Sequence, residues 1–351
     1  MPALEELLAA VIIIALSLYV LLGGADFGGG VWDLLASGPR KQAQRALIAD
    51  AIGPIWEANH VWLILVIVLL FADFPLAFTA IMTALFTPIT LMLIGIVLRG
   101  ATFVFRSYDK QTDDVQRRWG SIFAIASIVT PIMIGVCVGA LASGRIAVTD
   151  GLVTSTTRAT WLAPFPLAIG LFTLLLFAYL AAVYLTVEAD DPALRADFRQ
   201  RALITTFLVE GVEVVVLLLM GSGAPLLLDG LTRSTWALPL HTLALLAFVG
   251  GVWALWTWRF YLARLLAIVQ VIGIIWGWGA AQYPYLIEPS VTIYNAAAPP
   301  IALRLTLIAL AAGSLLLFPA IYFMLRIFKG RRISSLFGGS LSALMDQMDH
   351  K

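Results

Sequence analysis

Five ionisable residues stand in strongly apolar parts of this sequence, where such groups are costly. Glu57 and His60 lie about one helical turn apart in AIGPIWEANHVWLILVIVLLF. Asp26 stands in LLGGADFGGGVWDLL, and Glu210 and Glu213 stand in ITTFLVEGVEVVVLLLM. A carboxylate at the centre of a membrane helix costs about 2.5 to 3.5 kcal/mol on insertion scales, so such residues usually face protein or water and mark routes for ions or protons.

The spacing of these residues indicates what each could do. Glu210 and Glu213 share one helix face, and two close carboxylates do not both ionise easily in a low dielectric, which suits a proton relay. They could equally cap a water-filled cavity or pair with a neighbouring subunit. Glu57 follows Pro54, which suits a first helical position, so this acid could also be a plain helix-start residue favoured by the helix dipole.

The composition identifies the class of protein that holds these residues. Of 351 residues, 61% are hydrophobic and 12% are charged, and the mean hydropathy is +0.96. No ordinary soluble domain has this balance. Barrel strands would alternate apolar and polar residues over about 10 positions, whereas LLAAVIIIALSLYVLL is apolar throughout. The sequence therefore predicts an all-α polytopic membrane protein.

Nine stretches are long enough to cross a hydrocarbon core of about 30 Å, which needs about 20 helical residues. They lie near residues 7–32, 54–73, 76–105, 119–143, 164–187, 202–221, 237–258, 260–283 and 300–328. Short connections favour antiparallel neighbours. Within a single membrane domain, 1–351, we expect a first four-helix bundle (1–145), a second (160–285), a peripheral ninth helix (300–328) and a cytoplasmic tail (329–351).

Basic residues indicate the orientation of the chain, because cytoplasmic loops carry an excess of Lys and Arg. With nine spans, the N-terminus and even-numbered loops hold Arg145, Arg158, Arg233 and Arg304, and the other 18 of the 22 basic residues lie on the opposite side. This predicts an outside N-terminus and a cytoplasmic C-terminus in the cytoplasmic membrane of a bacterium or archaeon. The first span begins with acids and lacks a cleavage pattern, so we expect it to be retained.

The counts of cysteine and histidine limit the cofactor chemistry. The single Cys137 excludes disulfides within the chain, cysteine-bound clusters and a C-x-x-C-H haem attachment. Among three histidines, only His60 and His241 could face each other across a haem, and the topology starts them at opposite faces. We therefore expect no haem on this chain alone. We also expect no bound metal, and no nucleic acid as a partner.

Four motifs carry a family resemblance: GGADFGGGVW, AIGPIWEANHVWLI, VLRGATFVFR and EPSVTIYNAAA. In their order and spacing the chain resembles subunit II of the cytochrome bd family of quinol oxidases. The resemblance implies a haem-bearing partner, subunit I, which holds haems b and d, oxidises quinol and reduces oxygen to water. Subunit II would be haem-free, not catalytic alone, and would contribute a proton-uptake path from the cytoplasm. A bound quinone or lipid and small single-span subunits stay open.

The resemblance also implies roles for particular residues. The acids of its motifs fall on Glu57 and Asp26, which would belong to the proton path, with His60 as a helper. Structural or path-lining roles are expected for the remaining motif residues Trp56, Asn59, Trp62, Arg99 and Arg106. Two departures matter: Glu57 stands where other members have Asp, and the position of His60 is not always histidine. No family motif covers Glu210 and Glu213, which we keep as a second acidic site.

Two other functions stay open from the residues alone. A secondary transporter also places carboxylates on Gly- or Pro-interrupted spans, and Asp26, Pro88, Pro131 and the Glu210 pair fit that pattern. A purely structural partner subunit would use its acids only to pair with its neighbour. Co-purification with a haem-bearing chain separates the oxidase from the transporter, and neutralising the acids in the complex separates the proton path from a structural role.

Overall fold

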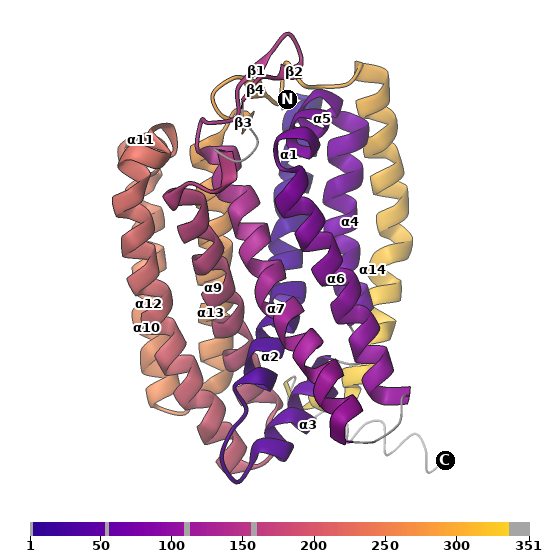
Figure 1. The fold of residues 1–351 in the computed structure, drawn as a ribbon, viewed down its shortest axis with the longest axis vertical. Coiled ribbons are helices and arrows are strands. Elements are labelled where there is room, and N and C mark those ends of the chain that lie inside the picture. Colours follow the sequence, from indigo (N-terminus) through magenta and orange to yellow (C-terminus); the bar gives the residue numbers. More distant parts are fainter. Residues whose placement is uncertain (1–2, 53–55, 109–112, 156–159, 337–351) are drawn as a thin grey trace. The chain divides into compact units, whose positions relative to one another are not determined.

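The computed structural model describes residues 3–52, 56–108, 113–155 and 160–336, and this part of the chain is almost entirely helical (Figure 1). The chain forms two units, residues 1–298 and 299–351. The second unit contains α14 (Pro300–Leu336), with Pro319 inside the helix. The peripheral position expected for this helix stays a prediction, and Pro54 lies outside the described residues.

The described residues contain eight helices that are long and apolar enough to cross a membrane. The count is nine if one bent pair of helices is a single span. This confirms the predicted all-α membrane protein. The helices of the first unit are α1 (Leu4–Tyr19), η1 (Val20–Gly24), α2 (Ala25–Leu34), α3 (Lys41–Ile52), α4 (Trp56–Asp73), α5 (Pro75–Ala84), α6 (Phe86–Tyr108), α7 (Asp113–Ala142), α9 (Pro164–Glu188), α10 (Pro192–Gly223), α11 (Pro225–Arg233), α12 (Ala237–Trp256) and α13 (Phe260–Gln282).

The third expected span, 76–105, is instead two helices. The axes of α5 and α6 meet at 87° around Leu85. Pro88 lies in the first turn of α6, where its ring excludes the carbonyl of residue 84 from a continuous helix. Elsewhere proline suits a helix start because its missing N–H costs nothing there, and α5, α9, α10 and α11 all begin with one.

Helix α9 is the centre of the first unit. It packs against α10 and α13 on one side and against α7 and α2 on the other, so the two expected groups of four spans touch through it. Its side chains are buried along most of its length. The outer helices instead expose large apolar residues, as on α10, where Ile204, Phe207, Leu208, Val214 and Val215 are exposed. Hydrocarbon rather than water suits such a surface.

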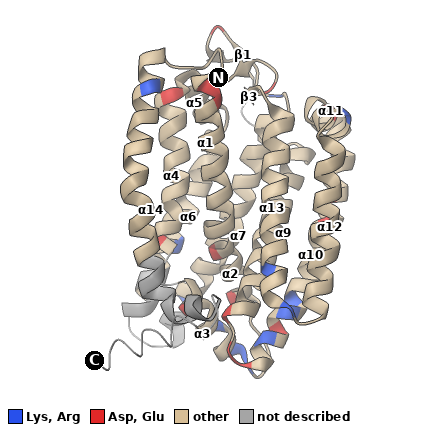
Figure 2. Cartoon of the chain, turned by 180° about the vertical axis from the view of Figure 1, so that it is seen from behind, with Lys and Arg blue, Asp and Glu red and all other residues tan. Residues whose placement is uncertain are grey.

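The two ends of the first unit differ in charge (Figure 2). One end, called the basic end, carries basic residues at the start of α3, in the first part of α10 and at the start of α13. They are Arg40, Lys41, Arg45, Arg195, Arg199, Arg201, Arg259 and Arg264. The other end, called the hairpin end, holds the start of α1 and two antiparallel hairpins (Figure 1). These are β1 (Val148–Thr149) with β2 (Leu152–Val153), and β3 (Tyr285–Ile287) with β4 (Val291–Thr292).

Glycines in α2 allow it to approach α9 closely. A Cβ at Gly28 would lie 1.9 Å from the carbonyl oxygen of Phe177, and one at Gly24 would lie 2.7 Å from the ring of the same residue. On the other side of α2, a Cβ at Gly30 would lie 2.0 Å from Ser127 Oγ of α7. Helix packing, rather than a cofactor, therefore explains this glycine-rich stretch.

Gly28→Ala is expected to destabilise the chain by about 1 to 3 kcal/mol or more, because backbone atoms of α9 must move to admit the methyl group. The apparent melting temperature of the purified complex measures the effect. Gly211→Ala is the matched control, since a Cβ there meets open space. Equal melting temperatures for the two variants would contradict the close-packing explanation.

Glu288, between β3 and β4, is a buried acid at the hairpin end. Its residue is 1% exposed, and its Oε1 accepts no hydrogen bond from the described residues. The backbone N–H of Glu288 donates to the carbonyl of Leu141 at 3.1 Å, which ties the hairpin to the end of α7. Burial raises the pKa of Glu288 from 4.5 to about 7.

This pKa predicts how stability depends on pH. The folded chain binds the Glu288 proton more tightly than the unfolded chain, so stability falls as pH rises from 4.5 to about 7. Glu288→Gln should remove that loss, which is about 1 to 3 kcal/mol. The variant is expected to melt several degrees above the parent at pH 8 and close to it at pH 4.5. A gap that does not change with pH would refute this assignment.

Candidate functional site

Asp26 is the most deeply buried of the candidate acids. It lies at the second position of α2, is 4% exposed, and its Oδ2 accepts a hydrogen bond from Asn59 Nδ2 of α4 at 2.7 Å. Asn59 is equally buried. A carboxylate at this depth is stabilised only by donors that the protein supplies, and Asn59 is one of them.

Arg99 of α6 supplies a buried positive charge that acts on this acid. It is 2% exposed and interacts electrostatically with Asp26. Its Cζ lies 4.8 Å from the ring centroid of Phe27 and 5.5 Å from that of Phe123, which places the guanidinium between two aromatic faces. Nevertheless its Nε and Nη2 find no hydrogen-bond acceptor among the described residues. Arg99 is thus a buried cation with two N–H donor groups that the described residues leave without an acceptor.

His60 of α4 lies in an aromatic pocket beside this acid and cation. Its ring centroid is 5.9 Å from that of Tyr19, 5.7 Å from that of Phe27 and 6.3 Å from that of Trp56. Asp26, Asn59, His60 and Arg99, with the rings of Tyr19 and Phe27, are called the Asp26 cluster below.

A π-helical segment explains how Tyr19 and Phe27 reach the same histidine. The two residues are eight positions apart, which is more than two turns of an α-helix at about 3.6 residues per turn. The segment η1 lies between them and holds an extra residue in its turn. Both rings therefore lie on the face that packs on α4. Nothing in the sequence signals this π turn except the neighbouring glycines, so neither aromatic residue was predicted to belong to the site.

Several polar atoms around the Asp26 cluster lack partners. Tyr19 OH, His60 Nδ1, Ser127 Oγ and Thr130 Oγ1 are buried and make no hydrogen bond with the described residues. Ser127 faces Gly30 of α2, and Thr130 faces Gly95 of α6. Buried polar groups are nearly always hydrogen-bonded, to protein or to ordered water. The interior between α2, α4, α6 and α7 therefore has unused hydrogen-bonding capacity that water molecules can satisfy.

Other residues of the motifs have different surroundings. Glu57 is exposed at the second position of α4, and Asn59 is the residue of this motif that hydrogen-bonds Asp26. Residues two apart do not face the same side of a helix. Trp62 is buried, as expected of a structural residue. The side chain of Arg106 lies outside what the structure describes.

Glu210 and Glu213 lie on α10, away from the helices that carry the Asp26 cluster. Gln270 of α13 donates from Nε2 to Glu210 Oε1 at 2.8 Å, and its own Oε1 is buried without a partner among the described residues. Glu213 interacts electrostatically with His241. Gln270 was missed because its sequence neighbours are apolar on both sides. A functional role for this acidic pair stays a prediction.

The two candidate histidines do not form a pair. His60 lies near the start of α4 at the basic end, whereas His241 lies near the start of α12, which begins at the hairpin end (Figure 1). A ring nitrogen of His241 lies 2.9 Å from the carbonyl oxygen of Leu231. A haem held by two histidines does not fit this arrangement. Within the described residues, no three His, Cys, Asp or Glu side chains gather as metal ligands.

Known proteins resemble this chain in sequence and in fold. The model of the family "Cytochrome bd terminal oxidase subunit II" matches residues 4–328. The chain is 24% identical over 321 residues to a Bacillus subtilis (strain 168) protein provisionally named cytochrome bd menaquinol oxidase subunit II, covering 89% of this chain and 91% of that protein. It is 28% identical over 209 residues to cytochrome bd-I ubiquinol oxidase subunit 2 of Escherichia coli (strain K12), covering 56% and 53%.

A solved structure supports the same fold. A chain of the bd oxidase from Geobacillus thermodenitrificans superposes with a TM-score of 0.73 at 21% sequence identity. The match covers 93% of this chain and 98% of that chain. The helical arrangement is therefore shared over nearly the whole length.

Asn59→Leu tests the hydrogen bond that reaches Asp26. Loss of a donor to a buried carboxylate should lower the stability of the assembled complex by about 1 to 3 kcal/mol. In an Asp26→Asn background the same change should cost about half as much, because hydrogen bonds to charged acceptors are roughly twice as strong. Melting temperatures of the four combinations measure this coupling, and equal losses in both backgrounds would show that the two side chains act independently.

Proposed function

Because the chain belongs to the family of cytochrome bd terminal oxidase subunit II, as its four motifs predict, we propose that it joins a haem-bearing subunit I and conducts protons toward it. The complex is a quinol:oxygen oxidoreductase of the bacterial respiratory chain, and this subunit is a multi-pass membrane protein. Membership in a family of oxidase subunits argues against the secondary transporter.

The observation that carries the proton-path proposal is the buried bond between Asp26 and Asn59. Its 2.7 Å length and the nearby Arg99 hold the carboxyl group of Asp26 in a fixed position, from which it can exchange a proton with a hydrogen-bonded neighbour. The partnerless atoms around it, Tyr19 OH, His60 Nδ1 and Arg99 Nη2, offer hydrogen bonds to a chain of water molecules. Such a chain would move protons to and from Asp26.

The entrance of the path would lie at the start of α4. Glu57 is exposed there, and His60 follows one turn later on the same side of the helix. The ring of His60 in turn contacts Tyr19 and Phe27 of the helix that carries Asp26. We therefore assign Glu57 as the outer acid, His60 as a link and Asp26 as the inner acid of the path.

The orientation proposed for the chain directs this path to the cytoplasm. Positive charge gathers at the basic end (Figure 2), and cytoplasmic ends of membrane proteins carry the excess of Lys and Arg. The N-terminus of α1, at the opposite end, would then face outside (Figure 1). Protons for the reduction of oxygen would enter where Glu57 lies.

We assign no haem to this chain, in keeping with the separation of His60 and His241. The haems that the family implies for the complex supply electron transfer and oxygen reduction. The contribution of this chain is made by its own carboxylates and their hydrogen-bond donors, which hold and release protons.

A purely structural subunit is the second candidate function. One observation favours it: the guanidinium of Arg99, stacked between Phe27 and Phe123, is positioned as a fixed counter-ion to Asp26. In that case Asp26 would stabilise the packing of α2, α4 and α6, and no proton would pass through it.

Neutral variants in the assembled oxidase separate the two functions. Asp26→Asn should lower quinol-dependent oxygen consumption by about 10- to 100-fold, because proton transfer by a positioned side chain typically contributes about 10²-fold or more. Glu57→Gln should cause a smaller loss, since water also reaches an exposed entrance. Oxygen uptake by the purified complex measures both.

The control is Asp229→Asn, which changes an exposed acid at the hairpin end that forms an ion pair with Arg233. It should retain parental activity. Haem content, read from the visible spectrum, must be equal in all variants for the comparison to hold. Full activity of both Asp26→Asn and Glu57→Gln with full haem content would eliminate the proton path and leave the structural function.

A further inference from the structure

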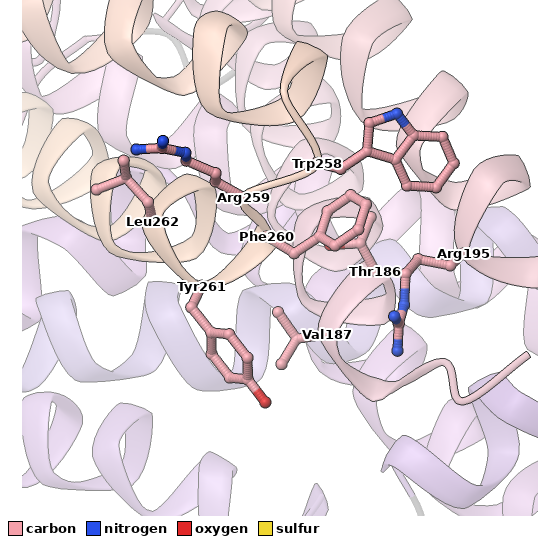
Figure 3. Close-up of a pocket in the computed structure, with 8 residues that line it drawn as sticks. All are labelled: Thr186, Val187, Arg195, Trp258, Arg259, Phe260, Tyr261 and Leu262. Atoms are coloured by element: carbon pink, nitrogen blue, oxygen red, sulfur yellow. The ribbon is translucent and has the colours of Figure 1, made fainter. Parts of the chain in front are cut away.

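A cavity of about 420 Å³ lies at the basic end, between the end of α9, the start of α10 and the α12–α13 turn (Figure 3). Thr186, Val187, Arg195 and the consecutive residues 258–262 line it. Two of these side chains are arginines and three are aromatic, and no carboxylate is among the described residues that line it. This lining suits an anion with an apolar part.

Arg195 is held in place at one side of the cavity. Its Nε and Nη2 both donate to the carbonyl oxygen of Ala189, at 3.1 and 2.6 Å, which completes the end of α9. Its Cζ lies 5.7 Å from the ring centroid of Phe260. Nη1 makes no hydrogen bond with the described residues. A guanidinium fixed in this way can present its remaining donors to an anion without a further loss of side-chain freedom.

The first turn of α13 forms the floor of the cavity. Residues 260–262 begin this helix, and its N-cap, Arg259, offers no side-chain hydrogen bond to them. The backbone N–H of Ala263 donates to the carbonyl of Arg259 and is the first in this helix to do so. The N–H groups of residues 260–262 precede it and have no acceptor within the helix. In Figure 3, Arg195 and Arg259 lie on opposite sides of Phe260. The guanidinium of Arg259 stacks on Trp253, with its Cζ 4.8 Å from the ring centroid. The cavity is therefore lined by Arg195 on one side, by Arg259 at its edge and by the positive end of a helix.

Trp258 forms the outer wall, in a strained backbone conformation. Its φ is +62°, and the bonds from Arg259 N to Ala254 O at 2.8 Å and from Trp258 N to Leu255 O at 3.4 Å form a Schellman motif. Glycine usually occupies this position, and a bulky residue there is a rare outlier. Arg199 donates to Leu255 O at 2.6 Å and stacks 5.0 Å from the indole. Such strain concentrates at ligand sites.

We propose that this cavity binds the phosphate headgroup of an anionic phospholipid from the leaflet at the basic end. Arginine between membrane helices recognises such headgroups, and Trp258 and Tyr261, both exposed, suit the boundary between headgroups and acyl chains. Two acids of the adjoining α9–α10 segment interact with other groups: Glu188 lies 3.9 Å from Arg264, and Asp191 caps α10. The site does not depend on the proposed proton path.

Native mass spectrometry of the intact oxidase tests the proposal. The purified complex is titrated with phosphatidylglycerol, with phosphatidylcholine of the same chains, and with inorganic phosphate. Phosphatidylglycerol should bind most tightly. Arg259→Gln should weaken its binding about fivefold, the loss expected for one basic residue near an anionic headgroup. This variant carries little folding risk, because Arg259 is exposed and its side chain makes no hydrogen bond with the described residues.

A second variant and a control complete the design. Trp258→Gly removes the aromatic wall and suits the positive φ, so the complex should fold and still lose phosphatidylglycerol. Arg233→Gln, whose side chain is 82% exposed at the hairpin end, should bind as the parent does. Equal binding of the two lipids by the parent, or unchanged binding by both cavity variants, overturns the site. Equally tight binding of inorganic phosphate overturns its assignment to a lipid.

Discussion

The carbonyl oxygen of Phe177 occupies the space that a side chain at position 28 would need, and this contact joins the two halves of the first unit. Trp32 Nε1 donates to the carbonyl of Ala178 at 2.8 Å and strengthens the same junction. Close backbone approach is what stabilises helix pairs in a membrane, where lipid offers no hydrophobic driving force. Because α2 is fixed against α9, the opposite face of α2 presents Asp26 to α4 and α6.

That placement creates an electrostatic problem that the neighbouring residues partly solve. Asp26 and Arg99 are both nearly inaccessible, and taking two charges out of water usually costs more than their attraction returns. Asn59 and the rings beside Arg99 offset part of the cost. The donors left over on Arg99, together with the π turn beside Asp26, are features that stability alone does not favour, and π turns are frequent at functional sites.

The basic end carries both of the sites proposed above. Glu57 lies there at the start of α4, and the cavity beside Arg195 lies there next to the start of α10. Both depend on charge near the boundary between hydrocarbon and water, where ionised groups are less costly than at the midplane. An anionic headgroup in the cavity would also neutralise part of the positive charge that surrounds it.

The sequence by itself determined the membrane-spanning helices, the charge asymmetry and the motifs containing Asp26 and Glu57, because hydropathy and charge add up locally along a chain. Tertiary structure decided which residues meet. It made Asn59 the partner of Asp26, brought Tyr19 and Phe27 to His60, divided one expected span at Leu85, and formed the cavity at Trp258. These outcomes depend on helix phase and on contacts between distant segments, which no local pattern in the sequence records.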